Sequence, residues 1–294
     1  MTGWMVPWFR WSARKPGARA WSLMGPGLLF LVIFFLGPLA FMLGYSFMPR
    51  GIYGGVKPGF TFEAYKTFFQ PLYLGVLWRT VVYSVVCTVA CLGLGYPVAY
   101  VISRAGQWKN MLMFLVILPF WTSFLVRTFA MMFLMRDTGL INTALISLGV
   151  ISEPIAMYPT SFAVMLGLIY GFLPFMILPI YTSLEKLDHS LLEAAEVLGA
   201  KPWERFTRVV LPLSMPGVVA GSLLVFIPAL GSYLTSDLLG GSKYDMIGNI
   251  IARQFGAGNN WPFGSAASFA MMGLVLLAVV AYLRTRDDAA MGNA

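Results

Sequence analysis

Ionisable side chains are scarce in this 294-residue sequence. Asp, Glu, Lys and Arg together make up 11% of the residues, and there is one histidine. Hydrophobic residues make up 59%, which is more apolar surface than the core of one water-soluble domain can hide. The composition therefore argues against an ordinary soluble protein and predicts a chain embedded in a lipid bilayer.

Cysteine is also nearly absent. Cys87 and Cys91 are the two cysteines, and their spacing of four places both on one face of a helix. No histidine or carboxylate lies nearby in the sequence to complete a metal-binding set, and small thiols commonly pack inside helices. We therefore expect both to be packing residues and predict no metal site.

A nucleotide-binding phosphate loop is missing as well. Its pattern, Gly-x-x-x-x-Gly-Lys-Ser/Thr, occurs nowhere in the sequence. The Gly-Gly-Ser-Lys run at 240–243 lacks both the spacing and the hydroxyl residue after the lysine. The chain therefore cannot be an ATPase of this kind.

Long apolar runs, by contrast, are abundant. Crossing about 30 Å of hydrocarbon takes roughly 20 mostly apolar residues per helix. The runs here are too long and continuous for barrel strands, and backbone polar groups in lipid must be satisfied within each segment. We predict an all-α fold with six spans, at residues 22–48, 77–103, 111–135, 160–184, 214–239 and 266–283.

Basic residues predict the orientation, because positively charged loops tend to remain in the cytoplasm. With both termini inside, twelve of the 20 basic residues lie on the inner side. The predicted parts are a basic cytoplasmic N-terminus at 1–21, a transmembrane domain at 22–284 with a cytoplasmic loop at 185–212, and a cytoplasmic tail at 285–294. The first apolar run is longer than the 7 to 15 or so residues of a signal-peptide core, so we expect it to remain as an anchor.

The net charge of +8 raises the question of a nucleic-acid partner. The basic residues flank the predicted helices instead of forming a tract, so membrane topology already accounts for them. We expect the lipid bilayer, and no nucleic acid, as the partner of these charges.

One polar segment, 185–208, interrupts the apolar sequence. Leucine and alanine recur in it at helical spacing among charged residues, which predicts an amphipathic helix. Asp188 or Ser190 can cap its start, and Gly199 can end it. Pro202 then favours a second short helix, from about 202 to 209.

Small residues on this helix allow a partner to approach closely, so we interpret the segment as a docking element. The alternative is a helix lying on the membrane surface. Such a helix favours a basic polar face, whereas this one is acidic in its first half.

The spacing of residues in this segment resembles the signature loop of the membrane subunits of ATP-binding-cassette importers. The pattern is Glu-Ala-Ala, three residues, Gly, nine residues, an aliphatic residue, any residue and Leu-Pro. The single departure is Val209, where isoleucine is usual. In that family the loop inserts into a cleft on a cytoplasmic ATPase. The resemblance implies ATPase-coupling residues Glu193, Ala194, Ala195, Gly199, Leu211 and Pro212, with Glu193 and Gly199 at the core of the contact.

Further stretches narrow the resemblance to the membrane subunits of spermidine/putrescine importers, and to the first of that system's two permease subunits. Examples are Leu-Pro-Phe-Trp-Thr at 118–122 and Trp-Pro-Phe-Gly at 261–264. The other stretches are 94–97, 125–127, 173–176, 183–188, 236–238, 240–241 and 247–249.

This resemblance implies a six-helix type I importer permease in the inner membrane that has no catalytic residues of its own. It implies a second permease subunit, two ATPase subunits that carry the ATP and Mg, and an external substrate-binding protein. The same architecture carrying another small solute or ion is the alternative within the class. A secondary transporter, the alternative outside it, would need its own coupling-ion site, and we see no internal repeat of the kind such transporters use.

A polyamine crossing the membrane needs carboxylates, carbonyls or aromatic faces in place of water. The candidates for its path are Asp237, Tyr233, Trp121, Tyr170 and Tyr181. Two alternatives stay open. Asp237 can instead pair with Arg127, and the aromatic residues can be packing or interface anchors.

Two further segments have functional interpretations. The loop 240–264, with its Trp-Pro-Phe run, is interpreted as a docking or gating surface or else as an ordinary stable loop. Pro174 and Pro179 remove hydrogen bonds from the fourth predicted helix, which favours a hinge there.

Overall fold

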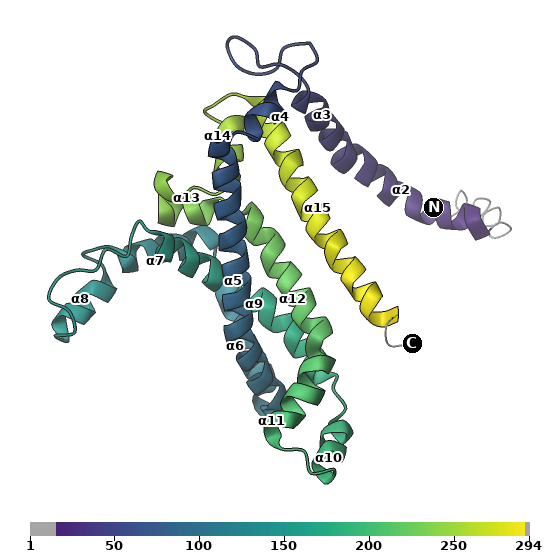
Figure 1. Ribbon diagram of the computed structural model, residues 1–294, viewed down its shortest axis with the longest axis vertical. Helices are drawn as coiled ribbons and strands as arrows, with labels where there is room; N and C mark the ends of the chain where they lie inside the picture. The colour runs from purple at the N-terminus through teal and green to yellow at the C-terminus, as the bar shows by residue number, and fades with distance from the viewer. Residues whose placement is uncertain (1–15, 292–294) are drawn as a thin grey trace, which may run out of the picture. The chain divides into compact units, whose positions relative to one another are not determined.

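A computed structural model describes residues 16–291 of the chain (Figure 1). The described residues form helices joined by turns and loops, with one isolated antiparallel bridge between Arg50 and Val56. The predicted all-α class is therefore confirmed. The predicted N-terminal and C-terminal segments lie partly outside the described residues, at 1–15 and 292–294.

Six helical segments are long and apolar enough to cross a membrane, which confirms the predicted number of spans. Three of them, Met24–Ser46, Ser161–Glu185 and Trp261–Val280, begin within five residues of the predicted starts. The full set is Met24–Ser46, Pro71–Arg104, Phe124–Ser147, Ser161–Glu185, Pro202–Gly231 and Trp261–Val280.

The third predicted span, 111–135, is not one continuous helix. Helix α6 (Lys109–Ile117) runs into a 3-10 turn, η3 (Leu118–Trp121), and α7 (Phe124–Met135) begins only after an extended Thr122. Pro119 has no N–H to continue the helix, and the Thr122 hydroxyl donates to the Pro119 carbonyl at 2.7 Å. The span identified from the structure instead continues from α7 into α8 (Leu140–Ser147).

The fifth predicted span, 214–239, starts and ends too late. The helix begins at Pro202 as α11 (Pro202–Arg205), passes through a π-helical turn η4 (Phe206–Val210) and continues as α12 (Leu211–Gly231). It ends where Ser232 turns extended, after Pro228 has removed one N–H from the last turn. Residues 234–240 form a separate short helix, α13 (Leu234–Gly240).

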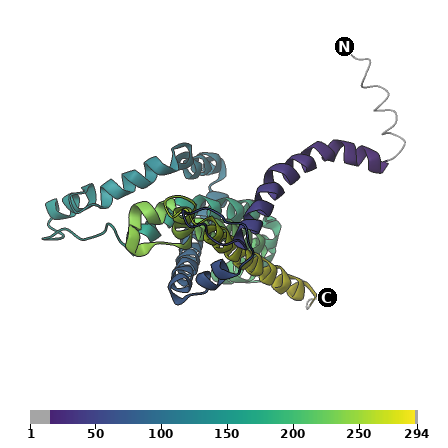
Figure 2. The ribbon, with the colours of Figure 1, turned by 90° about the horizontal axis from the view of Figure 1, so that it is seen from above.

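The chain divides into two compact units, of which the larger comprises residues 70–253. Its core consists of α5 (Pro71–Arg104), α9 (Ser161–Glu185) and α12. Glycine lets α9 and α12 approach closely, because a Cβ at Gly217 would lie 2.5 Å from the Pro179 carbonyl oxygen. Cys87 and Cys91 are fully buried in this core, as expected for packing residues. In Figure 2, α7 and α8 extend away from the bundle of α5, α9 and α12.

The smaller unit comprises residues 1–69 and 254–294. Within it, α3 (Gly37–Ser46) and α4 (Glu63–Phe68) pack on α15 (Trp261–Met291), and the described chain starts with α2 (Pro16–Leu31) and a π-helical turn η1 (Val32–Leu36). The Tyr65 hydroxyl donates to Ser46 Oγ at 3.0 Å, and the ring of Tyr45 meets that of Trp261 edge-on at 6.2 Å.

Candidate functional site

The polar loop between α9 and α12 folds as a helical hairpin made of α10 (His189–Val197) and α11. The Asp188 carboxylate caps α10 by accepting from the Ser190 N–H at 2.9 Å, which confirms one of the two predicted caps. The second helix does not stand alone as predicted, because α11 continues through η4 into α12. The second arm of the hairpin is therefore continuous with a candidate membrane span.

Gly199 ends the first arm of the hairpin, as predicted. Its φ of +81° lies in the left-handed region that favours glycine, and its N–H donates to the Glu196 carbonyl at 2.9 Å. Apart from its two chain neighbours, no described residue has an atom within 4 Å of the position that a Cβ would take. The space beside Gly199 is open, as a docking surface requires.

Two polar contacts lie at the turn between the arms. The Glu196 carboxylate accepts from the Arg205 guanidinium at 2.5 Å, so the pair joins α10 to α11. The Glu204 carboxylate accepts from the Lys201 N–H at 3.0 Å and satisfies the first turn of α11.

Apolar side chains project from the hairpin into solvent. Val197 is 88% exposed, Leu198 86% and Trp203 71%. Exposed apolar residues at a fixed turn mark an interaction surface. The sequence pattern assigned Leu198 to the apolar stripe of the helix and gave no role to Trp203, so this tip emerges only from the structure.

The predicted coupling residues do not share one surface. Glu193, Ala194 and Gly199 are exposed on the first arm, and Ala195 is half-buried. Leu211 and Pro212 form the first turn of α12 instead, where the missing N–H of proline is tolerated.

An aromatic joint ties the hairpin to α5. The ring of Phe206, in η4, meets the rings of Tyr96 and Tyr100 edge-on at 5.7 and 5.8 Å. The Tyr96 hydroxyl lies 2.8 Å from Ser214 Oγ, which donates in turn to the Leu211 carbonyl. The hairpin is therefore coupled to α5 as well as to α9 and α12.

A second link lies at the C-terminal end of α9. Lys109, at the start of α6, contacts the Glu185 carboxylate at 2.6 Å. The hydrogen bond to Glu185 raises the pKa of Lys109 above its usual value. Since both side chains are 41% exposed, this pair contributes little to stability.

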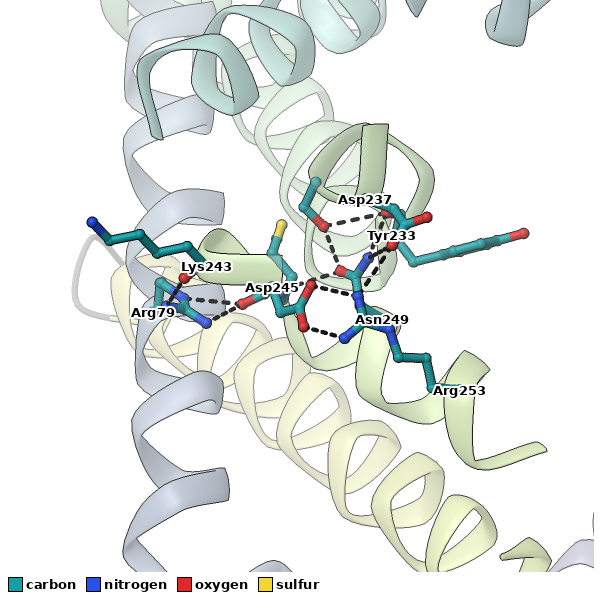
Figure 3. Close-up of polar contacts among 9 residues, drawn as sticks. Arg79, Tyr233, Asp237, Lys243, Asp245, Asn249 and Arg253 are labelled. Atoms are coloured by element: carbon teal, nitrogen blue, oxygen red, sulfur yellow. Dashed lines mark hydrogen bonds and ion pairs between the residues drawn. The ribbon is translucent and has the colours of Figure 1, made fainter. Parts of the chain in front are cut away.

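At the other end of the larger unit, an ion-pair cluster surrounds Asp237 (Figure 3). Arg253, on α14 (Ile247–Phe255), binds Asp245 through two contacts of 2.5 and 2.9 Å and Asp237 through one of 3.2 Å. The hydrogen bonds that Arg253 donates to Asp245, reinforced by the one to Asp237, raise the pKa of Arg253. Arg79 of α5 donates to the backbone carbonyls of Lys243 and Asp245, which fixes the loop that carries Asp245.

Asn249 is buried beside this cluster and forms hydrogen bonds with it. Its amide nitrogen donates to the Tyr233 carbonyl at 3.0 Å and contacts Asp237 at 3.4 Å. Its amide oxygen accepts from the Met246 N–H and from the Ser236 hydroxyl. Tyr233 and Asp237, both predicted path residues, are thus brought together at the start of α13 by a side chain that sequence reasoning had not singled out.

The ion pair of Asp237 is made with Arg253 and not with Arg127, which corrects one of the two alternatives drawn from the sequence. Arg127 lies on α7 among aromatic rings, 5.0 Å from the centre of Phe120 and 5.9 Å from that of Tyr170. Its Nε and Nη1 atoms are buried and have no hydrogen-bond partner within the described part of the chain. The ring faces are the groups that lie against this cation.

The remaining path candidates lie apart from Asp237. Trp121 is 75% exposed in η3 and meets Phe114 edge-on at 5.6 Å. Tyr170 lies beside Arg127, and Tyr181 is eleven residues further along α9, close to Glu185. The structure therefore brings together only two of the five candidates. Among the described residues, no group of three or more His, Cys, Asp or Glu is placed to hold a metal ion.

Comparison with known proteins places this geometry in a family. Residues 91–289 match the family described as binding-protein-dependent transport system inner membrane component. The spermidine/putrescine transport system permease protein PotB of Haemophilus influenzae is 44% identical over 255 residues, covering 86% of this chain and 89% of that protein. PotB of Escherichia coli is 43% identical over 251 residues, covering 84% and 91%.

Solved structures show the same fold. A chain of a bacterial alginate ABC transporter, in complex with a periplasmic protein bound to an alginate pentasaccharide, superposes with a TM-score of 0.72 at 18% identity and covers 92% of this chain and 94% of that chain. A chain of the MetNI methionine ABC transporter gives a TM-score of 0.56 at 19% identity, covering 72% and 93%.

Proposed function

Because the chain belongs to the family of binding-protein-dependent transport system inner membrane components, we propose how its geometry serves that family's task in this protein. The chain is a multi-pass inner-membrane permease subunit of an ATP-driven polyamine importer, and it is a transport subunit, not an enzyme. Identity of 44% over most of both chains to a spermidine/putrescine permease is the observation that carries this function.

Two cytoplasmic ATPase subunits would supply the energy, each with ATP and Mg bound. The hairpin α10–α11 is the element suited to receive one of them. Its exposed apolar tip consists of Val197, Leu198 and Trp203, and the space beside Gly199, which lies between them in the sequence, is open. A groove on the ATPase would bury these side chains together with Glu193 and Gly199, the expected core of the contact.

Closure of the ATPase pair on ATP would then move the hairpin. The continuous helix from Pro202 to Gly231 transmits that movement, and the joint of Phe206 with Tyr96 and Tyr100 carries it to α5. A second, similar permease subunit would complete the path, which opens alternately to the inside and to the outside. An external binding protein would deliver the cargo.

Asp237 and Tyr233 are the residues that we assign to the cargo path. The Asp237 side chain is 50% exposed. It accepts one hydrogen bond from Arg253, which is longer than the two hydrogen bonds that Arg253 donates to Asp245. An ammonium group of a polyamine can therefore replace Arg253 at Asp237 while Arg253 keeps its better partner. The exposed ring of Tyr233 offers a π face beside it.

The experiment that tests this function uses the complete complex, purified through this chain and reconstituted in lipid nanodiscs. Its ATPase activity is measured with a panel of binding proteins, each loaded with a different solute. Stimulation by the spermidine- or putrescine-loaded protein is expected. Stimulation only by a binding protein loaded with another solute would show that this solute, and not a polyamine, is the substrate. The absence of any associated ATPase would refute the function.

A further inference from the structure

A hairpin-like turn projects from the loop that follows the first membrane span. The loop leaves α3 after Ser46 and returns to α4 at Glu63. Backbone hydrogen bonds pair its two sides at three successive levels, so residues 52–54 form the tip. The paired groups are the Phe47 carbonyl with the Thr61 N–H at 2.7 Å, the Pro49 carbonyl with the Lys57 N–H at 3.0 Å and the Gly55 carbonyl with the Gly51 N–H at 3.3 Å.

This turn is held in one conformation. Gly54 has a φ of +92°, and a Cβ there would lie 2.4 Å from the Asn259 amide nitrogen. The Gly55 N–H donates to the Asn259 carbonyl at 2.8 Å, and the Arg50 guanidinium donates to the Gly258 carbonyl at 2.8 Å. The turn is thus tied to the 256–260 loop of the same compact unit.

The tip presents two apolar side chains almost completely to solvent. Ile52 is 90% exposed and Tyr53 is 98% exposed. Because the backbone beneath them is already ordered, a partner that covers them has little loop entropy to remove. A rigid tyrosine beside an aliphatic residue is typical of the anchors that contribute most of the affinity in protein interfaces.

A pocket of about 320 Å³ opens at the base of the same turn. Its lining includes Arg50, Thr61, Glu63 and Asn260, so it can take a polar side chain from a partner. The loop from 47 to 69 carries three basic residues, Arg50, Lys57 and Lys66, and one acidic residue, Glu63. An acidic rim on the partner would complement this net positive charge.

Chain topology determines the side of the membrane on which the turn lies. The hairpin α10–α11 precedes the fifth span, whereas this turn connects the first span to the second. Successive connections between spans alternate between the two sides, so the turn and the α10–α11 hairpin face opposite compartments. If the hairpin meets the ATPase, the turn faces the compartment from which cargo arrives.

We propose that the Ile52–Tyr53 tip, with the pocket beside Arg50 and Glu63, is an anchor for the cargo-loaded substrate-binding protein. The partner is a folded protein that offers an apolar recess with an acidic rim. This inference rests on the proposed function and adds to it the residues at which that protein docks.

Membrane lipid fits the tip less well. Aromatic residues that anchor a protein in the headgroup region lie at the ends of spanning helices. That place is taken here by a cluster in which Phe47 stacks on Phe60 at 5.7 Å and lies 5.3 Å from Tyr65. The tip lies two hydrogen-bonded levels beyond this cluster, and contact with lipid does not require a fixed backbone.

The test is a titration of the nanodisc complex with polyamine-loaded binding protein. In the double variant Ile52→Ser/Tyr53→Ser, the concentration that gives half-maximal ATPase stimulation should rise about tenfold or more. Basal activity and the stimulated maximum should stay unchanged. Leu148→Ser is the matched control, because Leu148 is 76% exposed in the connection between the third and fourth spans, on the same side. An unchanged half-maximal concentration in the double variant would overturn the inference.

A photo-crosslinking residue introduced at position 53 gives an independent result. An adduct with the binding protein is expected, and adducts with lipid alone would overturn the inference and assign the tip to the bilayer. The wild-type complex separates this inference from the function on which it rests. A wild-type complex that no loaded binding protein stimulates refutes the proposed function, whereas a stimulated wild type with an unaffected double variant refutes the docking site alone.

Discussion

The carboxylate of Glu196 lies 2.5 Å from the guanidinium of Arg205, across the turn at Gly199 that joins α10 to α11. Despite this short distance, the Glu196 side chain is 66% exposed, and exposed pairs of this kind contribute about 0 to 1 kcal/mol. We therefore expect Glu196→Gln to leave the melting temperature of the complex nearly unchanged and to lower ATPase association less than twofold or so. A large loss of association on pull-down would show that Glu196 contacts the ATPase itself.

Gly199 is the more sensitive position in the hairpin. Gly199→Val places a β-branched residue at a φ of +81°, which costs about 1 to 3 kcal/mol locally. ATPase association and uptake should fall while membrane insertion stays intact. Gly199→Asn is the matched control, because asparagine tolerates the left-handed region, and it should retain most of the association. Equal association by the valine and asparagine variants would contradict a role for the turn geometry.

Phe206 tests the connection between the hairpin and α5. Phe206→Ala removes the ring that meets Tyr96 and Tyr100, so α5 should no longer follow the hairpin. Uptake should fall severalfold while the reconstituted complex still hydrolyses ATP. Trp203→Ala serves as the comparison. Trp203 is 71% exposed and stacks on Phe206 at 5.8 Å, but within the described part of the chain its ring meets no ring of α5, so its loss should affect ATPase binding before coupling. Parallel losses of uptake and hydrolysis in Phe206→Ala would argue against a coupling role.

Asp237 and Asp245 share Arg253 but should respond differently to neutralisation. Asp237→Asn removes an exposed carboxylate and leaves the two bonds between Arg253 and Asp245 in place. Polyamine uptake should drop while assembly with the ATPase is unchanged. Asp245→Asn removes a nearly buried carboxylate, 12% exposed, and should lower thermal stability as well. An unaltered uptake rate in Asp237→Asn would remove this residue from the cargo path.

Local sequence signals predicted some of these features well. The six spans follow from the length of the apolar runs, and the hairpin follows from Asp188 as a cap and Gly199 as a stop. The span 111–135 was predicted as one helix because the run is mostly apolar, whereas the structure breaks it before α7, next to Pro119 and the bond from the Thr122 hydroxyl to the Pro119 carbonyl. The start of the fifth span was missed because a polar segment, 202–210, turned out to continue directly into the helix.

Contacts between residues far apart in the sequence could not be predicted from hydrophobic periodicity. Arg127 was the alternative partner of Asp237 because both were expected near the outer ends of their helices. The fold of α13 and α14 instead places Arg253 beside Asp237, sixteen residues away in sequence. Similarly, Phe206 belongs to a segment that was predicted as a polar loop, and Tyr96 belongs to a predicted membrane span, so the sequence did not indicate that they meet. Such pairings depend on how the helices pack, which periodicity does not specify.

Arg79 provides a test of that long-range packing. Its guanidinium, on α5, donates to backbone carbonyls of Lys243 and Asp245, 164 and 166 residues further along the chain. Lysine has no planar fork with which to reach both carbonyls, so Arg79→Lys should leave one exposed or part-buried carbonyl without its donor and loosen the loop, at a cost of about 1 kcal/mol. Amide hydrogen exchange of residues 241–246 should become faster, while exchange in α10 stays the same. The loop carries Asp245 and orients Arg253 toward Asp237, so the same variant should also reduce uptake. Slow exchange in this loop together with normal uptake would show that Arg79 is dispensable for the cluster around Asp237.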